Sequence, residues 1–468
     1  MIDRAMTRIA GLFVVLFAIL AVRQGYVQLI AAPTIAAHAD NPRHALLDAG
    51  RGRILATDGT ILAQTVDGKR SYPLGASLAH TIGYVSTRYG TSGLEDAYDQ
   101  ALSPPQAAGD PYAQVMALIG SMGGGSGEIR GADVVTTIVP KIQAELYAEL
   151  DRHARAAGVV LDPRTGAVLA IASVPSFDPN TVDQTFSSLA GDSSSPLLDR
   201  ALDGLYPPGS TFKIFTASAA LDSQTVQMDS RFNDPGYLDV GNFRLHNDED
   251  EYTGNADLTT AFALSSNVDF AQIALRVGLD TFYQYLDRWG IGDSLDFQIP
   301  ASRARIPVRD GLTPGELAQM GFGQGALLMT PLQMALIDAT IAGGGNEPRP
   351  FIERRIVRSG TVSSVFEPST LTQPISADTA AEVKKMMIAV VAHGTGTPAQ
   401  LDGVVVAGKT GTATNPLGAA HSWFVCFAPA DAPRVAVAIV VENAGYGAAV
   451  AAPIARDVLK TALQNVGT

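Results

Sequence analysis

Apolar segments with strand character occur near residue 160 and again beyond residue 400, and mostly helical patterns separate them. Segments 158–161 and 167–172 flank Asp162–Gly166, whose Pro, Thr and Gly suit a tight turn between antiparallel strands. The later segments are 404–412, 422–428 and 435–441. We therefore predict an α/β chain of the α+β type. One central antiparallel sheet is closed by distant parts of the sequence and covered by helices.

Helices are predicted where apolar residues recur at helical spacing or where a proline begins such a run. Segment 134–138 is predicted as a strand that precedes the first of them. The predicted helices are Pro140–Arg155, Thr211–Asp222, Thr259–Val277, Pro331–Ala342 and a last one that begins at Pro453.

Composition excludes several classes of function. The chain has 468 residues, 46% of them hydrophobic and 17% charged, which is enough apolar material for two or three folded domains. Its net charge of −13 argues against nucleic acid as a partner, because nucleic acid binds basic faces. The single cysteine, Cys426, lies in an apolar run and is predicted to be a buried hydrophobe. His246, His393 and His421 are not spaced as a metal set, so we expect no metal or other cofactor.

Three regions are predicted along the chain: a tail and membrane anchor over 1–30, a β-rich module over 31–130 and a large α+β domain over 131–468. In the second region, segments 53–56 and 60–63 flank an Asp-Gly pair and predict a hairpin. A glycine-rich stretch just before residue 130 has the composition of a flexible linker.

The apolar run Ile9–Val22 is the one targeting signal. It is shorter than the roughly 20 residues that a spanning helix needs, but it lengthens if Arg23 reaches the outer interface. Arg4 and Arg8 precede it and favour a cytoplasmic N-terminus. We therefore expect a single-pass anchor in the inner membrane, with the rest of the chain outside the cytoplasm. A signal peptide cleaved at Ala37–Ala39 and a buried core helix are the alternatives.

Ser210 and Lys213 lie three residues apart at the start of a predicted helix, and Pro207–Gly209 allows a sharp turn just before them. Lys213 shares a helical face with Ser210. The apolar residues that follow are expected to bury Lys213, and burial lowers the pKa of a lysine from about 10.4 toward neutrality. A neutral Lys213 would accept the Ser210 proton, so that the serine oxygen attacks a carbonyl. The alternative for this common pattern is a capping serine with a surface lysine.

Ser265-Ser266-Asn267 interrupts the predicted helix 259–277 with three polar residues. We predict that the Ser265 hydroxyl passes a proton to a leaving amine. We predict that Asn267 hydrogen-bonds a substrate amide and holds Lys213 in place. A polar patch within the helix, or a cap between two helices, is the alternative.

Lys409, Thr410, Gly411 and Thr412 lie in an apolar strand pattern. Gly408 and Gly411 permit close approach of another backbone, as a substrate aligned along this strand would require. Lys409 and Thr410 are predicted to bind a terminal carboxylate, and Gly411 and Thr412 to line the substrate. A surface strand with an incidental lysine is the alternative.

Two further roles connect these motifs. Lys409 is the candidate second cation that would help to lower the pKa of Lys213. The backbone N–H groups of Ser210 and Thr412 are predicted to form an oxyanion hole.

In this order and context, the three motifs resemble those of class B penicillin-binding proteins, the monofunctional D,D-transpeptidases of bacterial cell-wall synthesis. The resemblance covers nearly the whole chain. It implies a penicillin-binding transpeptidase/β-lactamase-like domain over 131–468 beside a non-catalytic pedestal over 31–130. Further strings that carry it are Arg51-Gly52-Arg53-Ile54, Asp58-Gly59, Leu62-Ala63, Ser92-Gly93-Leu94-Glu95, Pro175–Asn180 and Gly321–Gly325.

The resemblance implies a substrate and partners. Ser210 would be acylated by the D-Ala-D-Ala end of a peptidoglycan stem peptide with loss of D-alanine, and an amine of a neighbouring stem would resolve the acyl-enzyme. β-Lactams would acylate the same serine. The expected protein partner is a polytopic lipid II polymerase of the SEDS type, in cell elongation, division or sporulation.

Other readings stay open. A D,D-carboxypeptidase or β-lactamase would resolve the acyl-enzyme with water, but no E-x-x-L-N string lies between Asn267 and Lys409, as a class A β-lactamase would need. A non-catalytic β-lactam sensor or division scaffold is a second alternative, although we expect no cytoplasmic signalling domain before Ile9. Cys426 departs from the family pattern, in which we expect glycine.

Overall fold

The computed structural model describes residues 16–17, 50–104, 130–248, 252–415 and 418–467. The predicted anchor therefore lies outside the described residues except for Leu16 and Phe17, and so do the alternative cleavage site and the glycine-rich linker. Over the ranges just given, none of the helices is both long enough and apolar enough to cross a membrane.

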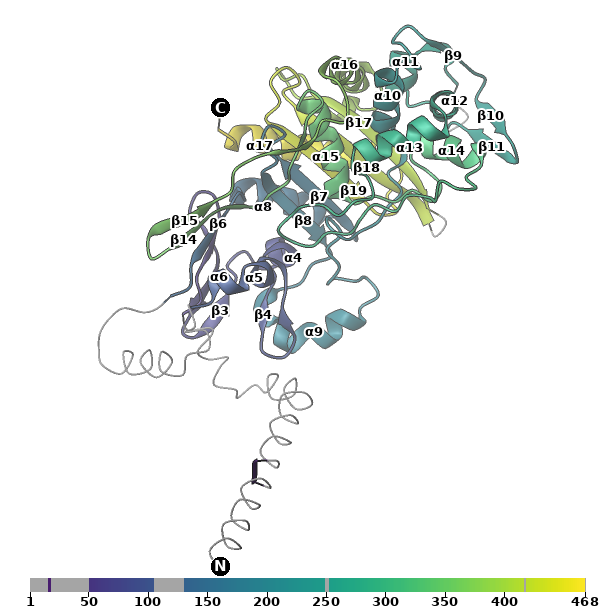
Figure 1. The fold of residues 1–468 in the computed structure, drawn as a ribbon. Helices are drawn as coiled ribbons and strands as arrows, with labels where there is room; N and C mark the ends of the chain where they lie inside the picture. The colour runs from purple at the N-terminus through teal and green to yellow at the C-terminus, as the bar shows by residue number, and fades with distance from the viewer. Residues whose placement is uncertain (1–15, 18–49, 105–129, 249–251, 416–417, 468) are drawn as a thin grey trace, which may run out of the picture.

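A five-stranded antiparallel sheet forms the centre of the larger part of the chain (Figure 1). Its strand order is β17-β18-β19-β7-β8, so strands from both ends of this region pair side by side, as predicted. The predicted turn at Asp162–Gly166 joins β7 to β8 as an antiparallel pair. The strands are β7 Ala156–Leu161, β8 Val168–Val174, β17 Ala407–Asn415, β18 Gly418–Ala428 and β19 Val435–Val441.

Both faces of this sheet are buried. Alternate residues of β19 point to opposite sides: Ala436, Ala438 and Val440 join one apolar cluster, whereas Val437 and Ile439 join the other. Helices α8 (Pro140–Leu150) and α17 (Ala451–Asn465) cover the second face. The mixed α/β fold with a central sheet flanked by helices is thereby confirmed. Cys426 is fully buried in the second cluster, as predicted.

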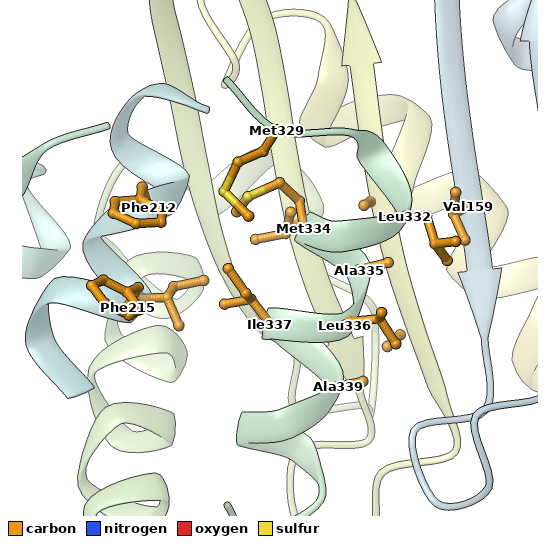
Figure 2. Close-up of a cluster of buried hydrophobic side chains, with 14 of the residues drawn as sticks. Val159, Phe212, Phe215, Met329, Leu332, Met334, Ala335, Leu336, Ile337 and Ala339 are labelled. Atoms are coloured by element: carbon orange, nitrogen blue, oxygen red, sulfur yellow. The ribbon is translucent and has the colours of Figure 1, made fainter. Parts of the chain in front are cut away.

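Helix α15 (Pro331–Ala342) lies on the first face of the sheet and is apolar nearly all round, which is the pattern of a buried helix. Figure 2 shows its side chains between Phe212 and Phe215 on one side and Val159 of β7 on the other. Because α15 fills this space, it packs between the segment around Phe212 and the sheet. That segment carries the candidate nucleophile.

Four predicted elements differ from the structure in their bounds. The helix that begins at Pro140 ends at Leu150 and not at Arg155, because Ala156 and Ala157 pair with β19. The predicted helix 259–277 is two helices with a break between them. The strand predicted from Val404 begins at Ala407, while the last helix begins two residues before Pro453.

The remaining helices and small strand pairs surround this core. The helices are α9 Val182–Gly191, α10 Lys213–Asp222, α11 Leu258–Ala263, α12 Asn267–Val277, α13 Leu279–Arg288, α14 Pro314–Gly321 and α16 Ala377–His393, with short 3₁₀ turns η3 Pro179–Thr181, η4 Gly209–Phe212 and η6 Thr397–Ala399. The strand pairs are β9 Arg231–Asp234 with β12 Gly254–Asp257, β10 Tyr237–Val240 with β11 Phe243–His246, and β13 Glu347–Pro348 with β16 Thr370–Thr372.

A second sheet of six strands belongs to the N-terminal module but recruits distant residues, in the order β15-β14-β6-β1-β2-β3. The predicted hairpin around Asp58-Gly59 is its β1–β2 pair. Strands β14 and β15 come from beyond residue 350; β14 pairs with β6, and β15 pairs with β14 at the edge of the sheet (Figure 1). The strands are β1 Ile54–Leu55, β2 Ile61–Val66, β3 Lys69–Ser71, β6 Asp133–Thr136, β14 Glu353–Arg358 and β15 Thr361–Val365; beside them are β4 Val85–Ser86, β5 Gly90–Thr91, η2 Gly75–Leu78, α4 Ala79–Ile82, α5 Gly93–Ala97 and α6 Asp99–Leu102.

A buried ion cluster joins two of the strings that carried the family resemblance. The Glu95 carboxylate accepts hydrogen bonds from Arg51 Nε at 2.7 Å and from Arg70 Nε at 2.6 Å. Each arginine side chain is only 3% exposed and the Glu95 side chain is fully buried. The string that contains Arg51 and the string that contains Glu95 thus hold the module together.

Candidate active site

A cleft of about 610 Å³ opens between η4, the start of α12 and the edge strand β17. It brings together residues from all three predicted motifs. Its lining residues are Ser210, Asn247, Asp248, Tyr252, Thr253, Leu264, Ser265, Ser266, Thr395, Thr410, Thr412, Tyr446 and Ala448.

Ser210 lies in the 3₁₀ turn η4, and α10 begins only at Lys213. The turn before it is closed by backbone contacts. Gly209 has a φ of +55°, and its N–H donates to the Gly323 carbonyl at 2.9 Å. A Cβ on Gly323 would lie 2.0 Å from the Gly209 carbonyl oxygen, so only glycine fits there. This contact gives the Gly321–Gly325 string a structural reason.

Strand β17 and its neighbour β18 hold the other side of this turn. The Trp423 indole N–H donates to the Pro207 carbonyl at 3.1 Å, and the Thr211 hydroxyl donates to the Pro208 carbonyl at 2.6 Å. A Cβ on Gly411 would lie 2.8 Å from Trp423 Cβ and 3.1 Å from the Pro208 oxygen. Gly411 therefore makes room for the protein's own chain, and its predicted contact with substrate stays a prediction.

The Ser265–Asn267 turn separates α11 from α12. Ser265 has a φ of +64°, a left-handed conformation that costs a serine about 1–2 kcal/mol and ends the first helix. The Ser266 hydroxyl accepts a hydrogen bond from the Asp269 N–H at 3.0 Å and so caps the second helix. The predicted alternative of a cap between two helices is correct for Ser266, and Ser265 faces the cleft.

Lys213 is completely buried behind the cleft. Its Nζ donates to the Ser265 carbonyl at 2.5 Å and to Asn267 Oδ1 at 2.8 Å, and it lies 3.3 Å from Ser265 Oγ. Burial lowers its pKa to about 7, while the carboxylates of Asp248, Asp269 and Asp234 raise it in part. None of the hydrogen bonds of this Nζ within the described residues is to Ser210, although we predicted that Lys213 reaches the serine oxygen.

Lys409 is also fully buried. Its Nζ donates to Ser265 Oγ at 2.8 Å and to the Thr410 carbonyl at 3.1 Å. Burial, and next the nearby Lys213, lower its pKa well below the usual value. Ser265 Oγ therefore lies between two lysine nitrogens, which is the geometry of a proton relay. Lys409 is not among the residues that line the cleft, but its Nζ contacts two residues that are, Ser265 and Thr410.

The carboxyamide of Asn267 is occupied at both ends. Its oxygen accepts from Lys213, and its nitrogen donates to the His246 carbonyl at 3.2 Å. Asn267 is not among the residues that line the cleft. It is thus placed to hold Lys213, while its predicted contact with a substrate amide stays a prediction.

Ser210 and Thr412 face the cleft from different elements, η4 and β17. That arrangement is compatible with the predicted oxyanion hole. Beside them the Thr395 and Thr410 hydroxyls pair at 2.5 Å. Two neutral hydroxyls at the cleft wall are suitable groups for a substrate carboxylate.

Sequence reasoning missed part of this wall. Thr395 was not selected, although its place between Gly394 and Gly396 was a signal. Asn247 was missed as well: its Oδ1 accepts hydrogen bonds from the N–H groups of Asn267 and Val268 at 2.7 and 3.0 Å. No spacing rule connects it with a turn twenty residues later.

Of the residues just after β19, Tyr446 lines the cleft. Glu442 instead accepts hydrogen bonds from Arg200 and from the Tyr206 hydroxyl, beside the Ser210 turn. Across the described ranges, no group of three or more His, Cys, Asp or Glu side chains is arranged to hold a metal ion.

Comparison with known proteins gives a consistent result. The model of the penicillin binding protein transpeptidase domain matches residues 156–460, and that of the penicillin binding protein A dimerisation domain matches residues 51–120. The peptidoglycan D,D-transpeptidase PbpA of Mycolicibacterium smegmatis is 32% identical, and the alignment covers 99% of each chain. The peptidoglycan D,D-transpeptidase MrdA of Haemophilus influenzae is 29% identical over 84% of this chain and 69% of its own.

Solved structures agree. Penicillin-binding protein A from M. tuberculosis, as a ceftriaxone acyl-enzyme complex, superposes with a TM-score of 0.82 at 30% identity, covering 90% of this chain and 100% of that one. The D,D-transpeptidase domain from Eggerthella lenta gives 0.80 at 34% identity, covering 89% and 98%. The resemblance read from the motifs is confirmed: this chain belongs to the family of class B penicillin-binding proteins with a transpeptidase domain.

Proposed function

We propose that this chain is a serine-type peptidoglycan D,D-transpeptidase and that Ser210 is its nucleophile. One observation carries the proposal. Ser210 and Ser265 face one cleft, and Ser265 Oγ joins the buried Lys213 and Lys409 at 3.3 and 2.8 Å. Such a cluster supplies a nucleophile, a base that is half neutral near pH 7 and a relay for its proton.

In the acylation step, neutral Lys213 accepts the proton of Ser210. The serine oxygen attacks the carbonyl of the D-Ala-D-Ala bond, and the backbone N–H groups of Ser210 and Thr412 stabilise the oxyanion. The proton then passes through Ser265 to the leaving amine, so that D-alanine departs and an ester on Ser210 remains.

In the second step, an amine of a neighbouring stem peptide attacks the ester carbonyl. A new amide forms, the bond to Ser210 Oγ breaks, and the proton lost by the amine returns through Lys213 to the serine. Thr410, with Thr395 beside it, binds the terminal carboxylate of the donor, and Lys409 lies behind them with its Nζ donating to the Thr410 carbonyl.

A synthetic stem peptide that ends in D-Ala-D-Ala, offered with an amine acceptor, tests the proposal. We expect release of D-alanine, a crosslinked product, and loss of both in Ser210→Ala. Hydrolysed donor as the main product would identify a carboxypeptidase, and unchanged crosslinking by Ser210→Ala would reject the nucleophile.

We further propose that Ile9–Val22 anchors the chain in the inner membrane and that a lipid II polymerase of the SEDS type is its partner. The support for the anchor is the apolar run after Arg4 and Arg8, and the support for the partner is family membership. Carbonate extraction of membranes tests the anchor, since release of the full-length chain contradicts it. Co-purification with the polymerase from detergent tests the partner.

A further inference from the structure

The Ser265–Asn267 turn holds both lysines, yet its own shape is strained, because Ser265 has a positive φ. Something outside the turn must fix it. The contacts of Ser266, the middle residue, lead away from the cleft. Its hydroxyl donates to Asp234 Oδ2 at 2.8 Å.

Asp234, the last residue of β9, is completely buried and accepts hydrogen bonds from several segments. Its Oδ2 accepts from Asn247 Nδ2 at 2.7 Å and from both the N–H and the hydroxyl of Thr253 at 3.1 Å. Its Oδ1 accepts from the Gly236 N–H at 2.7 Å. The carboxylate therefore ties the turn to the loop that follows β11.

Asn247 completes the connection from the other side. While its Nδ2 is held by Asp234, its Oδ1 accepts from the N–H groups of Asn267 and Val268. Asp234 thus fixes the turn twice, directly through Ser266 and indirectly through Asn247.

We propose that Asp234 is a positioning residue: its buried carboxylate fixes the Ser265–Asn267 turn and, through it, the Nζ atoms of Lys213 and Lys409. The expected effect on the acylation rate rests on the proposed function, whereas the expected effect on the geometry of the turn does not. Asp234 does not line the cleft, and it acts through Ser266 and Asn247.

The pH at which Lys213 deprotonates reports the charge of Asp234 separately from its hydrogen bonds. The charged groups that face Lys213 are Lys409 on β17, Asp248 after β11, Asp269 on α12 and Asp234 on β9. A carboxylate near an ammonium group favours its charged form. Removal of the Asp234 charge should therefore lower the pH at which Lys213 deprotonates, and Ser266→Ala, which keeps this charge, should not.

Three variants test the inference. Ser266→Ala removes the hydrogen bond to Asp234 and the cap of α12 but keeps the carboxylate. Asp234→Asn removes the charge and the four hydrogen bonds that Oδ2 accepts. The matched control is Asp257→Asn, which changes the carboxylate that caps α11 and belongs to the strand paired with β9. Asparagine caps helices as well as aspartate does, so this control should be silent.

The first measurement is the rate of acylation by a fluorescent penicillin, as a function of pH. We expect roughly tenfold slower acylation for Ser266→Ala and about a hundredfold for Asp234→Asn, because small displacements of catalytic groups have effects of this size. Asp257→Asn should stay within twofold of the wild type. The pH midpoint should move down in Asp234→Asn and not in Ser266→Ala.

The second measurement, hydrogen exchange of peptides that span residues 258–270, needs no activity. We expect faster exchange at the turn in Ser266→Ala and Asp234→Asn only. Unchanged exchange at the turn, acylation rates within twofold of the wild type, or equal losses in Asp257→Asn would each overturn the inference. If Asp234→Asn does not fold, the acylation rate and the hydrogen exchange of Ser266→Ala decide whether the inference stands. If penicillin does not acylate the wild type, the proposed function is refuted. Hydrogen exchange alone then tests whether Asp234 fixes the turn.

Discussion

The two walls of the cleft are held by different kinds of contact. The Ser210 turn is fixed by the close backbone pair of Gly209 and Gly323 and by two neutral side chains, Trp423 and Thr211, which donate to its carbonyls. The Ser265–Asn267 turn is fixed by side chains that converge on Asp234 and Asn247. The turn that carries the nucleophile thus relies on close packing and neutral hydrogen bonds. The turn that carries Ser265 and contacts both lysines relies on a buried carboxylate.

The largest effect is expected when Lys213, the proposed base, is replaced. Lys213→Met keeps the apolar stem and removes the amine, so acylation by penicillin should fall about a thousandfold, within the usual range for general-base catalysis. Stopped-flow labelling measures the rate, and circular dichroism verifies the fold. A rate within tenfold of the wild type would remove Lys213 from its role.

A smaller effect is expected when the close contact between Gly323 and the Ser210 turn is disturbed. Gly323→Ala combines a positive φ with a Cβ only 2.0 Å from the Gly209 oxygen, so acylation should slow 10- to 100-fold and stability should fall by about 2–4 kcal/mol. Gly325→Ala is the matched control, since its φ is +79° but its nearest neighbour is 3.6 Å away. It should cost only the backbone term, about 1–2 kcal/mol. Equal behaviour of both variants would show that the contact with Gly209 is unimportant.

The pKa of Lys213 sets the dependence of acylation on pH. With a pKa of about 7, Lys213 is mostly protonated at pH 6 and mostly neutral at pH 8, so acylation should rise about tenfold across this interval. The same pKa lies below that of an unfolded lysine, so the unfolded state binds more protons between about pH 7 and 10.5 and this contribution to stability rises with pH. A flat rate profile from pH 6 to 8 would contradict the assignment.

The smallest effect concerns substrate recognition beside β17. Thr395→Val removes the hydroxyl that pairs with Thr410 and should weaken binding of a carboxylate-bearing β-lactam roughly fivefold, the value of one hydrogen bond. A neutral ester of the same compound should be affected less. Thr397→Val, at an exposed threonine nearby, serves as the control. Equal losses for acid and ester would exclude a carboxylate site at these hydroxyls.

Sequence reasoning was sufficient for local features and for the general architecture. The turn at Asp162–Gly166, the strands beyond residue 400 and the burial of Lys213 follow from residue types and spacing, and all three are present. It was insufficient where contacts between residues far apart in the sequence determine the local structure. The break at Ser265 depends on the carboxylate of Asp234, and the pairing of β14 with β6 joins residues more than 200 positions apart. Neither leaves a periodic signal.

The most direct test of the central claim is to identify the atom that penicillin acylates. Intact-protein mass spectrometry followed by peptide mapping should find one adduct, on the peptide and side chain of Ser210, and none in Ser210→Ala. A stable adduct on another residue, or a labelled Ser210→Ala variant, would contradict the account.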